Sequence, residues 1–322
     1  MKKRNVLGMC FLLFTVLFVL SACGEKNEGT KKEGAKQETL RIGVMPSTDN
    51  LPILVAQKEG IAKKNGLSIE FVPFKSVKDR DSAFRAGKVD GVISDVIALA
   101  IYEQAGMNVK VTSTTDDRFD LVATKDVKDV SELKGKTVVV VKNGGIGYTA
   151  EKMLAANGMT PEDVQMMDIP PVPTRLELLK NGKAAAAVLP EPFITMAKSF
   201  GIHKIESTID LKMNPFIIAF KDAFIKSHNQ ALSAFYQSYN AAVEEINANL
   251  KDEKVIQSYR EILVKNVGFP EALTNEIEIT PFSKATQIAP KEITEAFEWA
   301  KEKGLLKKQV KAEAVMDDTF IK

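Results

Sequence analysis

Three small residues in the stretch KNGGIGYTA have the spacing of a dinucleotide-binding loop. Gly145, Gly147 and Ala150 follow an apolar run at 138–141, and Asp168 lies near the end of the next strand-like run. In dinucleotide-binding proteins such glycines let a pyrophosphate approach the start of a helix, and the acidic residue binds a ribose hydroxyl. Taken alone, this stretch predicts an NAD-dependent enzyme.

A second group of candidate residues lies at four turns, each placed where a predicted strand ends and a helix begins. Ligands of open α/β sheets bind outside the carboxyl ends of the strands, and free N–H groups at a helix start favour anionic oxygens. Asp49, Asp95 and Glu191 lie at three of these turns; they would repel a bare inorganic anion, whereas an amine would give them a partner. We therefore expect a ligand with an anion-like end and an amine-like end. The expected contact residues are Ser47, Thr48, Asp49, Asn50, Ser94, Asp95, Asn143, Gly144, Gly145, Tyr148 and Glu191.

The same residue types also have structural explanations, which the sequence leaves open. Asp49 can cap a helix, and Asp95 and Glu191 can cap the helices that follow them or pair with a lysine. The serine and threonine before Asp49 can simply shape the turn. Tyr148 can be a wall of the site rather than a contact, and the glycines can form a tight turn that binds nothing.

Strand and helix patterns alternate after Leu40, which predicts the α/β class. The stretches 85–100 and 180–197 share the order helix, Gly-Lys, buried strand, acidic residue and helix, so we expect two similar lobes. The predicted strands cover 40–46, 67–74, 89–95, 109–115, 119–125, 131–141, 164–170, 184–193 and 214–222, and the predicted helices cover 49–66, 79–87, 96–106, 148–157, 174–183, 228–249, 253–266 and 290–303.

The N-terminus has the features of a secretory signal. Three basic residues precede an apolar run at 6–20, which as a helix spans about 22 Å, short of a hydrocarbon core of about 30 Å. The stretch LSAC that follows resembles the bacterial lipobox, in which the cysteine is lipidated and becomes the first residue. We expect a signal peptide at 1–22, lipidation of Cys23 and a polar tether at 23–38, which together predict a protein anchored outside the cytoplasm.

Cysteine content and charge argue against several functions. Cys10 would leave with the signal peptide and Cys23 would carry lipid, so no thiol would remain for a disulfide, a metal cluster or a nucleophile. The net charge is +2, or about −1 without the three basic signal residues, which is no footprint for nucleic acid. His203 and His228 lack metal-ligand spacing. We expect no catalytic residue, no cofactor and no metal.

Four stretches after the lipobox resemble the solute-binding proteins of bacterial ABC importers. The most similar branch serves sulfonates, taurine, nitrate and the pyrimidine precursors of thiamine. The motifs are MPSTDNLPILVAQKEGIAKKNGLSIEFVPF, FRAGKVDGVISD, VSELKGKTVVVVKNGGIGYTAEKMLAANGM and LPEPF, and their order covers nearly the whole chain.

This resemblance implies a bilobed α/β fold whose lobes are joined by a two-strand hinge. Lobe 1 would comprise 39–121 and 221–322, lobe 2 would comprise 122–220, and the hinge would lie near DLVATK and PFIIAF. The lobes of such a monomer close on a small-molecule ligand, catalyse no reaction and deliver the ligand to a permease and an ATPase. Two alternatives stay open: a tethered ligand sensor of the same fold, and an enzyme that binds NAD at the Gly145, Gly147 and Ala150 loop.

Overall fold

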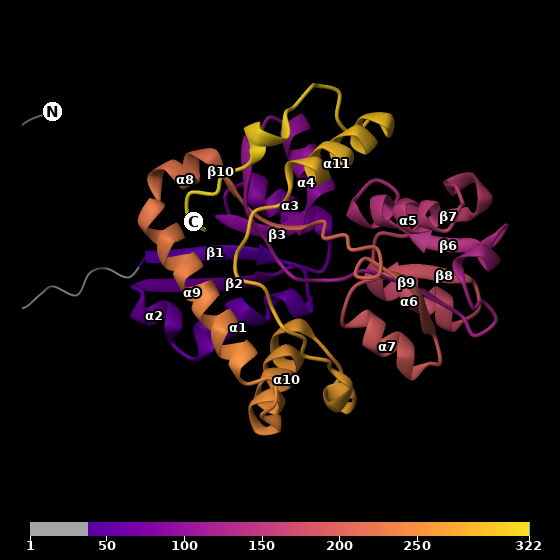
Figure 1. Ribbon diagram of the computed structural model, residues 1–322, viewed down its shortest axis with the longest axis horizontal. Coiled ribbons are helices and arrows are strands. Elements are labelled where there is room, and N and C mark those ends of the chain that lie inside the picture. Colours follow the sequence, from indigo (N-terminus) through magenta and orange to yellow (C-terminus); the bar gives the residue numbers. More distant parts are fainter. Residues whose placement is uncertain (1–37, 322) are drawn as a thin grey trace, which may run out of the picture. The chain divides into compact units, whose positions relative to one another are not determined.

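Two five-stranded sheets organise the chain in the computed structural model (Figure 1). The structure describes residues 38–321. The predicted signal peptide, Cys23 and nearly all of the predicted tether lie outside these residues. Glu38, which we had assigned to the tether, is the first residue of the first strand.

The first sheet combines four strands from the start of the chain with one strand from a later segment. It contains β1 (Glu38–Val44), β2 (Leu67–Pro73), β3 (Gly91–Asp95), β4 (Val109–Thr114) and β10 (Phe216–Lys221), in the order β2-β1-β3-β10-β4. β1 is parallel to β2 and β3, whereas β10 is antiparallel to β3 and β4. We call this sheet and its helices lobe 1.

The second sheet repeats this plan. It contains β5 (Asp120–Ala123), β6 (Thr137–Val140), β7 (Gln165–Asp168), β8 (Ala186–Leu189) and β9 (His203–Ser207), in the order β7-β6-β8-β5-β9. β6 is parallel to β7 and β8, and β5 is antiparallel to β8 and β9. The two sheets therefore match strand for strand, and the predicted bilobed α/β fold is confirmed. This second sheet and its helices form lobe 2.

The chain passes between the lobes twice, at 115–119 and at 208–215, which we call the crossing segments. The lobe limits expected from the sequence, after residues 121 and 220, fall inside β5 and β10 instead. The stretches DLVATK and PFIIAF, expected to form the hinge, supply these two sheet strands. Apolar composition alone cannot separate a strand that crosses between lobes from one that pairs within a sheet.

Helices cover both faces of each sheet. In lobe 1, α1, α2, α9 and α10 contribute to the core cluster on one face of the sheet, and α4 and α11 contribute to the cluster on the other. In lobe 2, α5 and α7 lie on opposite faces. The helices are α1 (Leu51–Lys58), α2 (Ile61–Lys64), α3 (Val77–Arg85), α4 (Val96–Gln104), α5 (Gly145–Ala156), α6 (Val172–Lys180), α7 (Phe193–Ser199), α8 (Asp222–Ser227), α9 (Asn229–Ala248), α10 (Glu253–Val267) and α11 (Pro290–Glu302). Short 3-10 helices are η1 (Thr48–Asn50), η2 (Val130–Leu133), η3 (Pro161–Asp163), η4 (Glu271–Glu276) and η5 (Ala312–Val315). None of the described helices has the length and apolar character needed to cross a membrane.

Two local departures from the predicted elements have simple causes. The single helix expected at 49–66 is split into α1 and α2 because Gly60 has a φ of +69°, a left-handed conformation that glycine adopts without strain. β9 was not predicted from the sequence. Its residues are mostly half-buried, so it lacks the apolar run that marks a buried strand.

Candidate functional site

A cavity of about 410 Å³ lies where both crossing segments meet residues from each lobe. It is lined by Thr48 of η1, by both crossing segments, by Glu191 after β8, and by Glu278, Thr280 and Pro281. Its charged lining residues are Asp116, Asp117, Arg118, Glu191, Lys212 and Glu278. Four acidic and two basic side chains thus line this space, which we call the acidic cavity.

Arg118 connects the parts of the acidic cavity. Its Nη2 lies 2.9 Å from Oε1 of Glu191, its Nε lies 3.7 Å from Oδ2 of Asp120, and its Nη1 lies 3.7 Å from Oε2 of Glu278. Asp120 is 2% exposed and its Oδ1 has no hydrogen-bond partner among the described residues. Burial raises the pKa of Asp120 to about 6. The single positive charge of Arg118 is therefore shared by three carboxyl groups, which carry more negative charge than it can neutralise.

Glu191 has both structural roles that the sequence left open. It accepts hydrogen bonds at the start of α7, and it forms an ion pair, although its partner is an arginine and not a lysine. The backbone N–H of Thr195 in α7 donates to Oε2 of Glu191 at 3.0 Å, and the Thr195 hydroxyl donates to Oε1 at 3.2 Å. Glu191 nevertheless lines the acidic cavity. Its placement there agrees with the expected ligand contact, which stays a prediction.

Ser47, Asp49 and Asp117 form a buried polar group beside Thr48. The Ser47 hydroxyl donates to Oδ2 of Asp117 at 2.5 Å. Asp49 is 1% exposed, and no side-chain capping hydrogen bond is made at the start of η1 or α1. The capping role considered for Asp49 is therefore wrong. Oδ1 of Asp49, Oδ1 of Asn50 and Oδ1 of Asp117 are buried without a hydrogen-bond partner among the described residues.

Ser94 and Asp95 lie at the end of β3, and their side chains have different surroundings. Ser94 accepts a hydrogen bond from Nη2 of Arg80 at 2.8 Å and belongs to a buried network inside lobe 1. Asp95 caps α4, since its Oδ1 accepts from the N–H groups of Ile97 and Ala98 at 2.9 Å each. The Asp95 carboxylate also lies directly against Gly145 of lobe 2: a Cβ on this glycine would be 2.5 Å from Cγ of Asp95. Neither Ser94 nor Asp95 lines the acidic cavity.

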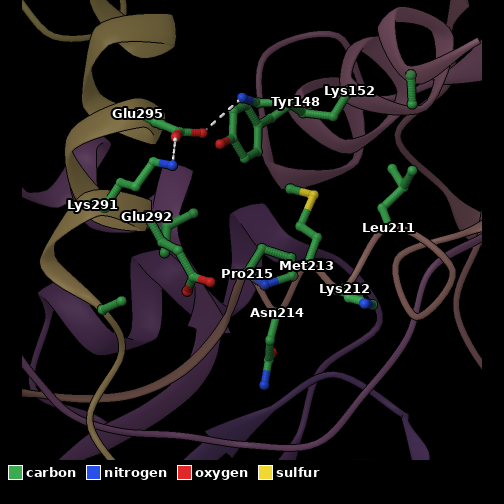
Figure 2. A pocket seen from close by; sticks show the side chains of 13 residues that line it. Tyr148, Lys152, Leu211, Lys212, Met213, Asn214, Pro215, Lys291, Glu292 and Glu295 are labelled. Carbon is green, nitrogen blue, oxygen red and sulfur yellow. Dashed lines mark hydrogen bonds and ion pairs between the residues drawn. The ribbon is translucent and has the colours of Figure 1, made fainter.

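Tyr148 faces a second cavity, of about 450 Å³, between α5, α11 and the second crossing segment (Figure 2). Its ring packs edge to face on Trp299 at 5.5 Å. Figure 2 shows Glu295 between Lys152 and Lys291. Its Oε2 lies 2.9 Å from Nζ of Lys152, and its Oε1 lies 3.7 Å from Nζ of Lys291. Three lysines and two glutamates line this second cavity. The expected residues are thus divided: Thr48 and Glu191 line the acidic cavity, Tyr148 lines the second one, and Asn143, Gly144 and Gly145 line neither.

The glycine pattern that suggests a dinucleotide site has a local packing explanation. A Cβ on Gly147 would lie 2.3 Å from the carbonyl oxygen of Lys142, and Gly145 leaves room for Asp95. Asp168, the expected ribose ligand, accepts a hydrogen bond from the backbone N–H of Lys142 at 2.8 Å. These contacts account for the same residues without a bound cofactor. Among residues 38–321, no three His, Cys, Asp or Glu side chains are grouped to hold a metal ion.

Sequence reasoning missed Asp116, Asp117 and Arg118, which lie between two predicted strands. A visible signal was present, because two adjacent aspartates followed by an arginine interrupt the apolar pattern in TTDDRFD. Their partners are distant in the chain: Ser47 is 70 residues from Asp117, and Glu191 is 73 residues from Arg118.

Comparison with known proteins identifies the family. The model of the NMT1-like family matches residues 33–259, which is more than half of the chain. The chain belongs to the NMT1-like family. The resemblance inferred from the sequence motifs is thereby confirmed.

The individual proteins that resemble this chain share little sequence identity with it. A protein of Brachyspira hyodysenteriae named as an ABC transporter periplasmic binding protein is 23% identical over 313 residues, covering 89% of this chain and 87% of the relative. The aliphatic sulphonate-binding protein SsuA of Escherichia coli has a TM-score of 0.71 at 16% identity, over 86% of this chain and 97% of that one. The nitrate-binding protein NrtA of Synechocystis PCC 6803 also has a TM-score of 0.71, at 14% identity, over 88% and 86% of the two chains. These structures share the fold.

Proposed function

We propose that this protein is the extracytoplasmic solute-binding component of an ABC importer. The observation that carries this proposal is the acidic cavity, which is lined from both lobes and from both crossing segments of a bilobed fold. Family membership and the relative named as an ABC transporter periplasmic binding protein support it. The protein would act as a monomer, held at the membrane by a lipid on Cys23, and would pass its ligand to a permease and an ATPase without making or breaking a bond.

The ligand that suits this cavity is a small polar organic solute, of the taurine-like sulfonate or aminopyrimidine type. A volume of about 410 Å³ is within the range of small-molecule sites. Although the structural relatives are named for sulphonate and nitrate, four acidic and two basic side chains line the cavity here. A bare anion such as nitrate would meet net repulsion, so the solute should also carry a group that donates hydrogen bonds.

Contacts between the lobes support closure on a ligand. Asp95 of lobe 1 lies against Gly145 at the start of α5 in lobe 2. In α5, Glu151 accepts a hydrogen bond from Nε1 of Trp299 in α11 at 2.8 Å. Separation of the lobes would break these contacts, and a ligand that binds residues of both lobes would favour the joined state.

A thermal-shift screen of the purified protein tests this function. The panel contains alkanesulfonates, taurine, nitrate, aminopyrimidines, thiamine, amino acids and NAD. A ligand present at 100 times its dissociation constant adds about 2.7 kcal/mol to the free energy of unfolding, which gives a readily measured rise in melting temperature. A rise with a small solute is the expected result. A rise with NAD alone would instead restore the dinucleotide-enzyme interpretation, and no rise with any compound would contradict solute binding.

A further inference from the structure

Two buried carboxyl groups, one lining the acidic cavity and one beside it, make no ion pair among the described residues. Asp49 follows β1, Asp117 belongs to the first crossing segment, and the Ser47 hydroxyl donates to Oδ2 of Asp117 at 2.5 Å. Asp117 lines the cavity, whereas Asp49 is 1% exposed and lies beside the lining residue Thr48. We call Asp49 and Asp117 the acid pair.

Three side-chain oxygens of this region accept no hydrogen bond from the described residues. Oδ1 of Asp49, Oδ1 of Asn50 and Oδ1 of Asp117 are buried, and none has a hydrogen-bond partner among the described residues. Asn50 is 0% exposed, and its amide nitrogen is already engaged with the carbonyl oxygen of Met45 at 2.8 Å. A buried acceptor without a donor destabilises the folded state, and more so when it is charged. Native proteins rarely retain three such groups together unless something else binds them.

The surrounding charges do not neutralise the acid pair. Asp116 and Glu191 add negative charge near it, and Tyr239 lies close enough to feel the charge of Asp49. Arg80 pairs with Asp81 at 2.9 Å, and Arg118 serves the three carboxyl groups described above. Lys212 also lines the cavity, and among the described residues it makes no ion pair with Asp49 or Asp117. Burial, followed by the neighbouring Asp117, raises the pKa of Asp49 well above its usual value, and burial raises the pKa of Asp117 to about 7.

We infer that Asp49 and Asp117, together with the side-chain oxygen of Asn50, bind a positively charged nitrogen group of the ligand, either an ammonium or an amidinium. Such a group carries several N–H donors and a positive charge, which are the two things that these oxygens lack. Charge-assisted hydrogen bonds of this kind are stronger than neutral ones. A sulfonate or nitrate has only acceptors and would leave all three oxygens unpaired. This inference rests on the proposed function and names the part of the solute that the cavity recognises.

Matched ligand pairs test the inference by isothermal titration calorimetry on the purified protein. The pairs are taurine and isethionate, β-alanine and 3-hydroxypropionate, and benzamidine and benzamide, which differ mainly in the cationic nitrogen group. In at least one pair, we expect the cationic member to bind at least tenfold more tightly. Asp49→Asn and Asp117→Asn should each abolish this preference, because an amide cannot supply the negative charge. Asp126→Asn changes an exposed aspartate of lobe 2 and should preserve it.

Proton release provides a second readout that a purely structural role would not produce. A bound cation favours the ionised form of the acid pair, so binding near pH 6 should release protons. The observed heat should therefore depend on the ionisation heat of the buffer in the parent protein, and less so in Asp117→Asn. Melting curves of each variant establish that it is folded.

The possible results separate this inference from the proposed function. Equal affinity within every ligand pair, or a preference that survives both substitutions, would overturn the inference, as would tight binding of Zn²⁺ or Ca²⁺ that both substitutions remove. The importer function would still stand if the wider thermal-shift screen detected another solute. If that screen detected none, the proposed function would fail, and the inference with it.

Discussion

Arg80 and Arg175 occupy corresponding positions in the two lobes but have different electrostatic surroundings. Each donates from Nη1 to the carbonyl oxygen of the residue 13 positions later, Ile93 at 3.0 Å and Val188 at 2.8 Å. Arg80 also has Asp81 as an ion-pair partner. Arg175 is 1% exposed, its Nε has no partner among the described residues, and burial lowers its pKa to about 9. The two lobes thus have an arginine at the same place in the fold, but among the described residues only Arg80 has an ion-pair partner.

Substitution of these two arginines should affect stability unequally. Arg80→Met leaves Asp81 and Ser94 without their buried partner and should cost about 3 kcal/mol of unfolding free energy. Arg175→Met loses one hydrogen bond but also removes a charge that lacks compensation, so we expect a change within about 1 kcal/mol. Urea unfolding measures both values. Equal losses would show that Arg175 has a compensating partner.

Stability of the ligand-free protein should fall as the pH rises from about 4 to about 7. The pKa of Asp117 is raised by burial to about 7 in the folded protein, against about 3.9 in an unfolded chain. Between these values the folded state holds a proton that the unfolded state has released, so the unfolding free energy decreases by up to about 1.4 kcal/mol per pH unit. Other carboxyl groups also titrate here, so the informative quantity is the difference from Asp117→Asn, whose slope should be smaller. Identical slopes in denaturant titrations would contradict the raised pKa.

Trp299, the only tryptophan of the chain, should report movement between the lobes. It is 8% exposed, packs on Tyr148 and donates its Nε1 hydrogen bond to Glu151. Loss of these contacts in Tyr148→Ala and in Glu151→Ala should expose the indole and shift its fluorescence emission to longer wavelength. The exposed Glu162 of η3 supplies the control Glu162→Ala, which should leave the emission unchanged. An unshifted spectrum in both test variants would mean that α11 keeps the indole buried without α5.

Gly147 should tolerate alanine far less well than Gly144 does. A Cβ at Gly147 would lie 2.3 Å from the backbone oxygen of Lys142, which cannot move aside like a flexible side chain. We expect Gly147→Ala to cost about 1–3 kcal/mol despite the high helix propensity of alanine. At Gly144 the nearest atom, Cγ1 of Val141, is 3.9 Å away, and Gly144→Ala should cost less than about 1 kcal/mol. Thermal unfolding compares them, and similar losses would refute the packing explanation of the glycine pattern.

Much of the secondary structure was predictable because its signals are local. Helices α9, α10 and α11 begin and end within one residue of their predicted limits. Matching motifs at 85–100 and 180–197 indicated two similar lobes. Sheet membership of β5 and β10 was not predictable, since pairing depends on residues from the other half of the chain.

Prediction of the candidate site was less complete, for the same physical reason. Thr48 and Glu191 were correctly placed at the ends of strands, and both line the acidic cavity. Asp117 and Arg118 were missed because they become parts of a cavity only when the crossing segment meets Ser47 and Glu191. A rule that looks only at strand-to-helix turns cannot find residues in a segment that joins two lobes.

The late insertion of β10 has a consequence for the order in which the protein can fold as it is synthesised. All strands of lobe 2 lie in the continuous stretch 120–207, whereas β10 places the strand that joins β3 to β4 at 216–221. When the chain emerges with its N-terminus first, all strands of lobe 2 are therefore present before lobe 1 has all of its strands. The N-terminal half of lobe 1, although synthesised first, remains incomplete until the later segments are made, so factors that protect unfinished chains would meet lobe 1 for longer than lobe 2.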